Sequence, residues 1–173
     1  NLVCRSATAD LFNNEGAYVR TPIKGRDGLV EIHSNSLPGE LKASSPDSVD
    51  PSEFDLVVLA MQEPQYSAPE VKDLVRKIAE SKVPTMAITN MPLLPYLKRI
   101  PGLSTDQLKE CFMEPSIWEG FDSELMTLCS PDPQAFRPPD ESPNILQVRL
   151  PTNFKAAKFS SSNYTDMLKV IER

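Results

Sequence analysis

Two stretches of the chain are continuously apolar, and an amphipathic pattern separates them. Residues 55–61 read DLVVLAM, and residues 84–90 read PTMAITN. Runs of this length and composition are typical of strands that are buried on both faces of a sheet. Between them, residues 69–81 place apolar side chains at helical spacing, with Lys and Arg on the other face. The pattern therefore predicts a strand, a helix and a second strand in this part of the chain.

The N-terminal part of the chain predicts a short strand, a helix and a hairpin. Residues 2–5 (LVCR) form a short apolar run that ends in a charge. A helix is expected over 8–16, with Thr8 as its N-cap and Gly16 at its end. Residues 17–34 contain two strand-like segments that flank KGRDG. This linker favours a hairpin because Gly and Asp tolerate the backbone angles of tight turns.

The remaining segments are less regular. Residues 35–53 are polar and predict a loop with one short helical turn. The chain has 17 prolines and 6 glycines, and the prolines are concentrated in residues 115–144. This concentration predicts a long irregular segment there, without regular helices or strands. The other expected elements are short helices over 93–100 and 104–113 (the latter capped by Ser104 or Thr105), a strand over 145–150, and a helix over 162–173 with Tyr164, Met167, Leu168 and Ile171 on one side.

The order of these elements predicts an α/β fold. A strand, a helix, a hairpin and then alternating strands and helices are expected to form a mostly parallel sheet with flanking helices and an inserted β-hairpin. In such sheets, ligands bind beyond the carboxyl ends of the strands. Segments 61–65 and 90–91 follow the two buried strands, so their polar side chains are candidates for contacts with a ligand.

Length and charge narrow the class of protein. The chain has 173 residues, 40% of them hydrophobic and 24% charged, which is typical of one globular domain. No apolar run is long enough for a membrane span, and no signal peptide opens the chain. The net charge is −6 and no basic face is evident, so neither a nucleic acid nor a membrane is expected as a partner. Because the first residue is Asn, we expect a segment upstream of it.

The cysteines and the histidine carry no evident chemistry. Cys4, Cys111 and Cys129 form no CxxC pair, so a disulfide framework or a structural zinc site is not expected. Reduced thiols indicate a cytoplasmic protein. His33 is the only histidine, which excludes an imidazole metal cluster, and it lies in a strand-like segment where a structural role is favoured over a catalytic one.

Arg5 is the candidate for binding a charged ligand. It follows the first apolar run, and Arg at such a position favours the 2′-phosphate of NADP over the free ribose of NAD. A guanidinium group and the Ser6 hydroxyl would suit a phosphate dianion. A solvated Arg at the start of a loop is the alternative, and spacing alone does not decide between them. The glycines never assemble into the GxGxxG fingerprint of dinucleotide-binding folds.

The ordered succession of several segments resembles the ketopantoate reductase (2-dehydropantoate 2-reductase) family. The segments are LVCRSATADLFNNEGAYVRTP, the hairpin, FDLVVLAMQEPQY and PTMAITNMPLLPYL. The resemblance begins at the second strand of the family's Rossmann domain and spans nearly the whole chain. It implies that 1–173 is a partial NADP-binding Rossmann-like domain without the Gly-rich turn, and that a helical substrate domain would follow residue 173.

The resemblance also implies a cofactor site. Arg5 and Ser6 match the positions that hold the 2′-phosphate of NADPH. Met61 lies at the strand end that contacts the cofactor, and Gln65 matches a polar position near it. Gln62 falls where the family usually has a cofactor-contacting Lys, and Gln cannot neutralise phosphate charge.

The substrate side of the site is only partly present in the matched segments. Asn90 matches an Asn between the nicotinamide and the substrate, and Met91 replaces the glycine that follows it in the family. No catalytic residue is expected in this chain, because the family's general-acid Lys lies in the helical domain. Lys155 and Lys158 are assigned to the last strands and a turn of the nucleotide domain.

The activity implied is NADPH-dependent reduction of a 2-keto acid to a 2-hydroxy acid in the cytoplasm, as in pantothenate biosynthesis. A homodimer is the expected assembly. A non-catalytic nucleotide-sensing or interaction domain is an alternative, which the departures at Gln62 and Met91 favour. A third reading keeps NAD(P) oxidoreductase chemistry with another substrate, because the Pro-rich segment 130–143 has no counterpart in the simplest family members. A serine hydrolase is excluded, since no histidine can serve as the base for Ser130 or for 160–162.

Overall fold

The computed structural model describes residues 1–89, 91–130, 134–149, 155–161, 164 and 167–169. The chain divides into two compact units, each built from two segments. The first unit comprises Asn1–Val49 and Asp132–Thr152, and the second comprises Asp50–Pro131 and Asn153–Arg173. No sheet is shared between the two units, and each unit has its own apolar cluster among the described residues.

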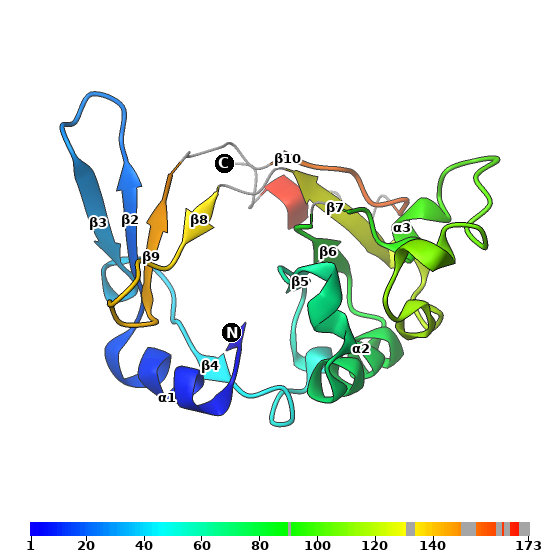
Figure 1. The fold of residues 1–173 in the computed structure, drawn as a ribbon, viewed down its shortest axis with the longest axis horizontal. Helices are drawn as coiled ribbons and strands as arrows, with labels where there is room; N and C mark the ends of the chain where they lie inside the picture. The colour runs from blue at the N-terminus through cyan, green and yellow to red at the C-terminus, as the bar shows by residue number, and fades with distance from the viewer. Residues whose placement is uncertain (90, 131–133, 150–154, 162–163, 165–166, 170–173) are drawn as a thin grey trace. The chain divides into compact units, whose positions relative to one another are not determined.

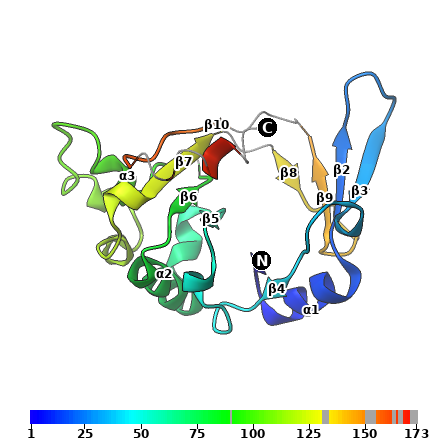
Figure 2. The ribbon, with the colours of Figure 1, turned by 180° about the vertical axis from the view of Figure 1, so that it is seen from behind.

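Among the residues that the structure describes, the first unit contains one α-helix, a two-stranded parallel sheet and a four-stranded sheet (Figure 1). Its elements are β1 (Leu2–Val3), α1 (Ser6–Glu15), β2 (Tyr18–Pro22), β3 (Leu29–His33), β4 (Ala43–Ser44), β8 (Ala135–Phe136) and β9 (Ile145–Val148). β1 pairs with β4. The larger sheet has the order β3-β2-β9-β8, in which only the β2–β9 pair is parallel. Figure 2 shows from behind how the β2–β3 hairpin lies beside β9. Ala9 and Phe12 of α1 pack against Ala43 of β4.

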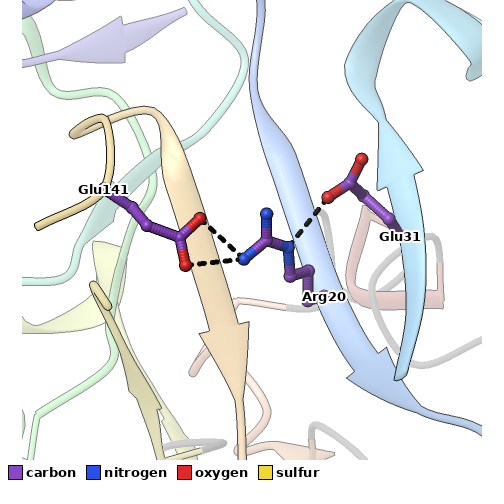
Figure 3. A network of polar contacts seen from close by, with 3 residues as sticks. All are labelled: Arg20, Glu31 and Glu141. Atoms are coloured by element: carbon purple, nitrogen blue, oxygen red, sulfur yellow. Dashed lines mark hydrogen bonds and ion pairs between the residues drawn. The ribbon is translucent and has the colours of Figure 1, made fainter. Parts of the chain in front are cut away.

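An arginine on β2 links the hairpin to the segment that precedes β9. Arg20 Nε donates to Glu31 Oε2 on β3 over 2.8 Å. Arg20 Nη1 donates to both carboxylate oxygens of Glu141, over 2.8 and 2.7 Å (Figure 3). The guanidinium group of this β2 residue therefore links β2 both to β3 and to the segment that precedes β9. Its several fixed N–H donors allow this, and a lysine could not reproduce it.

Gly16 forms the junction between α1 and the hairpin. Its φ of 74° lies in the left-handed region, and its N–H donates to the Phe12 carbonyl, which ends the helix. A Cβ on this residue would lie 2.6 Å from Ser34 Oγ and 2.9 Å from His33 Nε2. The Gly16 carbonyl accepts a hydrogen bond of 2.9 Å from the buried Asn144 side chain. Both the backbone angle and the space therefore require glycine here.

Replacing Gly16 with alanine should lower the free energy of unfolding by about 2–3 kcal/mol, since strain in a left-handed residue and steric crowding act together. Gly28→Ala is the matched control, because Gly28 also has a positive φ of 78° but would meet nothing within 4 Å. We expect the control to lose only about 1 kcal/mol. Urea denaturation of both variants measures the difference, and equal losses would contradict the crowded junction.

In the part of the chain that the structure describes, the second unit contains a sheet of the order β10-β7-β6-β5 and the helices α2 and α3. The elements are β5 (Val57–Leu59), α2 (Pro69–Ser81), β6 (Thr85–Ala87), α3 (Leu94–Leu97), β7 (Met126–Ser130) and β10 (Lys155–Ala156). β5, β6 and β7 run parallel and lie side by side in Figure 2, whereas β10 is antiparallel to β7. The neighbouring parallel strands β5 and β6 thus end at the same edge of the sheet.

Short 3-10 helices connect these elements. They are η1 (Ser34–Ser36), η2 (Pro51–Glu53), η3 (Glu63–Ser67), η4 (Lys109–Cys111), η5 (Pro115–Trp118) and η6 (Ser123–Leu125). Among them, η3 is the one that directly follows β5. Proline occupies one of the first two positions in η2, η3 and η5, where its missing N–H leaves no donor unsatisfied.

Two apolar groups form the core of the second unit. Trp118 is 1% exposed, packs at an angle of 67° to Tyr66 with 4.9 Å between ring centroids, and lies 5.7 Å from the Phe121 ring. Trp118 Nε1 finds no acceptor among the residues that the structure describes. The other group consists of Met86, Cys129, Phe159 and Leu168. The first group joins η3, which contains Tyr66, to η5, which contains Trp118. The second group includes Met86 of β6 and Cys129 of β7.

Several predicted elements are confirmed. These are the hairpin, the helix over 69–81, which begins and ends at the predicted residues, and the strand over 145–150, observed as β9. The two strands predicted to be buried are present but shorter than predicted, and β6 alone of the two is buried throughout. The burial predicted for β5 is wrong, because β5 is the edge strand of its sheet and Val58 is 43% exposed. The predicted Rossmann-like α/β class with a mostly parallel sheet, flanking helices and an inserted hairpin is also confirmed. Of the predicted last helix, Met167–Lys169 are helical and Leu168 is buried, while Ile171 lies outside the described residues.

Other predictions were wrong. The first helix begins at Ser6 with Arg5 as N-cap, so Thr8 is not the cap. The helix over 104–113 is reduced to η4, because among its residues Phe112 alone is fully buried and a short helix without packing is marginal. Residues 115–144, predicted to be irregular, contain the strands β7 and β8, which are stabilised by pairing with β6 and β9. That residues 1–173 form a single domain stays a prediction.

No helix in the described part of the chain has the length and apolar character of a membrane span. Among the same residues, no group of three or more His, Cys, Asp or Glu side chains is arranged to hold a metal ion.

Candidate functional site

The N-terminus of α1 carries unsatisfied hydrogen-bond donors. Arg5 is the N-cap, with an extended backbone (φ −62°, ψ 144°), and its carbonyl accepts hydrogen bonds from Thr8 N (2.8 Å) and Ala9 N (2.9 Å). No side chain caps this end, and the first turn has no acidic residue. The N–H groups of Ser6 and Ala7 donate to no residue in the described part of the chain. A helix end of this kind attracts an anion.

The charges around this helix end favour a phosphate. Arg5 is exposed and forms no ion pair within the described ranges. A cation beside the positive end of a helix is unfavourable by itself, and an anion bound between the two would relieve that repulsion. Ser6 is also exposed, so a guanidinium group, a hydroxyl and backbone N–H groups lie within two residues. The donor set fits a phosphate group.

Arg137 is a further cation near this end of the first unit. Burial raises the pKa of the Cys4 thiol, and the charge of Arg137 acts on the same group in the opposite direction. Cys4 directly precedes Arg5, which brings Arg137 into the neighbourhood of the phosphate candidate. Sequence reasoning missed Arg137 because it lies in the Pro-rich segment, where no pattern indicated that β8 returns the chain to this unit.

At the carboxyl end of β5, Gln62 and Gln65 bind each other. The backbone N–H of Gln62 donates to Gln65 Oε1 over 2.8 Å, and the backbone N–H of Gln65 donates to the Gln62 carbonyl over 3.0 Å. Both residues are exposed, while Met61 is half-buried. The carboxamide oxygen of Gln65 is therefore occupied within the turn, and its NH2 group is the part left for a ligand.

Two contacts hold this turn in place. Tyr66 is fully buried against Trp118, and burial raises the pKa of its hydroxyl, an effect that the Met61 backbone partly offsets. Tyr66 therefore stays protonated at neutral pH and serves as an anchor rather than a base. From the side, a carboxylate oxygen of Glu63 accepts the Met113 backbone N–H over 2.7 Å. The buried Tyr66 side chain and the hydrogen bond between Glu63 and Met113 thus hold the turn in place.

The carboxyl end of β6 lies next to that of β5. The Ile88 N–H donates to the Leu59 carbonyl over 2.8 Å, so the two segments leave the sheet together. Beyond them, Thr89 Oγ1 donates to the Met91 carbonyl over 2.6 Å, which tightens the loop after β6. Asn90 lies outside the described residues.

The predicted site residues therefore fall into two groups. Arg5 and Ser6 belong to the first unit, whereas Met61, Gln62, Gln65 and Met91 belong to the second. Within the second unit, the ends of β5 and β6 bring their members to one edge of the sheet. That both groups face one cleft stays a prediction, as do the cofactor and substrate contacts of each residue.

The residues predicted to have structural roles can also be placed. His33 Nε2 lies 3.0 Å from the Glu15 carbonyl, and its ring stacks 4.3 Å from that of Tyr18. These contacts fit the structural role predicted for it. Lys155 begins β10, and the Lys158 carbonyl accepts a hydrogen bond of 2.7 Å from Arg99 Nη2. Both lysines therefore lie on the last strand of the second unit or directly after it.

A groove in the second unit contains none of the predicted site residues. Its volume is about 580 Å³, and it lies between α2 and the segment 116–120. Its polar lining comes from Lys72, Asp73, Arg76, Glu80, Lys82 and Ser116. Arg76 is paired with Asp73 and Glu80, and Lys72 is paired with Glu114 at 2.5 Å. Its charges thus largely neutralise one another, which gives no preference for an anion or a cation.

Comparison with known proteins identifies the fold. No protein-family model and no curated protein sequence matches the chain. A protein assigned as a ketopantoate reductase from Ralstonia solanacearum MolK2 is 13% identical, with a TM-score of 0.62 over 98% of this chain and 48% of its own. A protein assigned as a 2-dehydropantoate 2-reductase from Enterococcus faecalis is 15% identical, with a TM-score of 0.51 over 98% and 44%. The chain therefore resembles the ketopantoate reductases in its fold and spans about half the length of each of these structures.

Proposed function

We propose that this chain is the nucleotide-binding part of an NADPH-dependent oxidoreductase that reduces a 2-keto acid to a 2-hydroxy acid. The fold carries this proposal, because two proteins assigned as ketopantoate reductases match 98% of the chain. The site supports it independently. Arg5 lies at the uncapped N-terminus of α1, without an ion pair in the described part of the chain, and offers the donors that a 2′-phosphate requires.

In this proposal the chain binds and orients the cofactor. NADPH would supply the hydride, which is chemistry that the cofactor carries itself. Arg5, Ser6 and the free N–H groups of the first α1 turn would hold the 2′-phosphate. The turns after β5 and β6 would hold the part of the nucleotide that lies over the sheet edge, with Gln62 as a donor. Asn90 and Met91 would face the substrate, and a proton donor for the reduced carbonyl would come from outside these residues.

The test uses the intact protein. We expect its affinity for NADPH to be at least about tenfold higher than its affinity for NADH, since hydrogen bonds to a charged group are worth roughly 1.5–3 kcal/mol each. We also expect it to consume NADPH when mixed with ketopantoate or another member of a panel of 2-keto acids. Titration calorimetry measures the first result and loss of NADPH absorbance the second. If the intact protein binds neither nucleotide, the proposal is wrong.

One observation favours a second candidate, a nucleotide-binding domain without catalysis. Residues 61–67 (MQEPQYS) carry no cation and one carboxylate, Glu63, whereas the ketopantoate reductase pattern has a Lys at the position of Gln62. NADPH binding without turnover of any 2-keto acid by the intact protein would select this candidate.

A further inference from the structure

The turn after β5 is held together by one of its own side chains. The N–H of Gln62 donates to Gln65 Oε1, and the N–H of Gln65 donates to the Gln62 carbonyl. The two bonds link the same pair of residues in opposite directions. They form a reciprocal arrangement like a capping box, which fixes the backbone of Gln62 relative to η3.

This arrangement also determines how the Gln65 carboxamide is oriented. A backbone N–H can only donate, so the carboxamide must direct its oxygen to Gln62 and its NH2 group away from it. The NH2 group donates to no residue that the structure describes. The side chain thus has one end committed to the turn and one end available at the edge of the sheet.

The surroundings make the turn a rigid support. Tyr66 follows Gln65 directly and is fully buried against Trp118. Pro64 restricts the backbone before Gln65, and its carbonyl accepts a hydrogen bond of 2.7 Å from Ser67 Oγ. The bond between Glu63 and Met113 N ties the turn to a segment 50 residues away. Within η3, Gln65 is the residue that connects this support to Gln62.

We propose that Gln65 is a positioning residue, which acts on the bound nucleotide through Gln62. Its side-chain oxygen holds the backbone from which the Gln62 side chain extends, at the carboxyl end of the parallel strand β5, where a ligand is expected. This inference rests on the proposed nucleotide-binding function and goes beyond it, because it assigns the two glutamines different tasks. Gln62 contacts the nucleotide, and Gln65 keeps Gln62 in place.

The first arm of the test needs no nucleotide. Amide hydrogen exchange of Gln62 is measured by NMR in the intact protein and in two variants. Gln65→Met has nearly the same shape but lacks the acceptor, and we expect the Gln62 amide to exchange about fivefold faster, as the loss of one hydrogen bond predicts. Gln65→Glu keeps an acceptor oxygen at the same place and should retain the protection. Unchanged protection in Gln65→Met, or lost protection in Gln65→Glu, would overturn the inference.

The second arm separates positioning from direct contact. NADPH affinity is measured for Gln65→Met, for Gln62→Ala and for the double variant. If Gln65 acts through Gln62, each single variant loses affinity about five- to tenfold, and the double variant loses little more than Gln62→Ala alone. Additive losses would mean that Gln65 contacts the nucleotide by itself and would overturn the inference. Ser81→Ala is the control, since it removes a side-chain hydrogen bond to a backbone carbonyl at the end of α2, outside this turn, and should leave both readouts unchanged.

The two proposals fail in different ways. If the unsubstituted intact protein does not bind NADPH, the proposed function is wrong, whatever the exchange data show. If it binds NADPH but the Gln62 amide or the double variant behaves contrary to expectation, the proposed function stands and the role of Gln65 is wrong.

Discussion

Replacing Arg5 with alanine in the intact protein is expected to weaken NADPH binding about 10- to 100-fold, which corresponds to the roughly 1.5–3 kcal/mol of a hydrogen bond to a charged group. NADH binding should change by less than about twofold, because NADH has a hydroxyl where NADPH has the 2′-phosphate. The physical reason lies at the N-terminus of α1, where Arg5 is exposed and the first N–H groups have no acceptor among the described residues. Titration calorimetry with both nucleotides measures the effect.

Two further variants sharpen this result. Arg26→Ala removes an exposed arginine from the turn of the hairpin in the same unit and should leave both affinities unchanged, which controls for net charge. Arg5→Lys should lose part of the NADPH affinity, since an ammonium group keeps the charge but not the planar fork that matches a phosphate. A loss that is equal for NADPH and NADH would contradict the assignment of Arg5 to the 2′-phosphate. Weaker folding would not explain a selective loss, because it would lower both affinities, and the Arg5 side chain forms no cap hydrogen bond to α1.

Trp118→Ala should lower the free energy of unfolding by about 3–5 kcal/mol, the usual loss for truncation of a large buried aromatic side chain. Trp118 is 1% exposed and packs against both Tyr66 and Phe121, so its removal leaves a cavity that these two rings cannot fill without moving. Urea denaturation followed by circular dichroism measures the loss. Because Tyr66 anchors the turn that carries Gln62, NADPH binding should weaken as well.

Two control variants accompany Trp118→Ala: one keeps an aromatic ring at position 118, and the other truncates an exposed residue of the same unit. Trp118→Phe should lose clearly less than alanine does, because the ring volume is largely kept and the unsatisfied Nε1 is removed. Met113→Ala, at a residue that is 68% exposed, should change stability by less than about 0.5 kcal/mol. A loss below about 1 kcal/mol for Trp118→Ala would show that the aromatic group does not form the core of this unit.

The elements that could be predicted are those with strong local signals. The helix Pro69–Ser81 combines a proline at its first turn with apolar residues at helical spacing, and it is observed as predicted. The hairpin was evident from the glycines in KGRDG, where Gly25 and Gly28 adopt positive φ. In both cases the residues that decide the structure lie within one turn or one helix.

The elements that were missed depend on distant partners. β4 is two residues long and exists because it pairs with β1, and β7 gains its stability from pairing with β6. β4 lies in the polar segment 35–53 and β7 in the Pro-rich segment 115–144, and neither strand has a local pattern that distinguishes it from a loop. The opposite error occurred at 104–113, where a capping residue and a helical spacing were present but packing was not.

The candidate site was predictable in position but not in detail. The ends of β5 and β6 were correctly placed next to each other, since consecutive parallel strands end at one edge. The role of Gln65 within its own turn was not, because a glutamine that binds a ligand and one that binds a neighbouring N–H have the same sequence signature. The uncapped end of α1 was missed as well, since Thr8 is the better cap by residue type.

The pairing of β2 with β9 has a consequence for biosynthesis. Gly16 and its partner Asn144 are 128 residues apart, so a growing chain that has left the ribosome only as far as β7 cannot complete the first unit. By then β5, β6 and β7 of the second unit are all available to pair. This three-stranded part of the second unit should therefore form before the first unit is complete, whereas β10 joins it only after β9 has emerged. Until β9 emerges, the β2–β3 hairpin has an unpaired edge, and we expect chaperones to engage the chain at that stage.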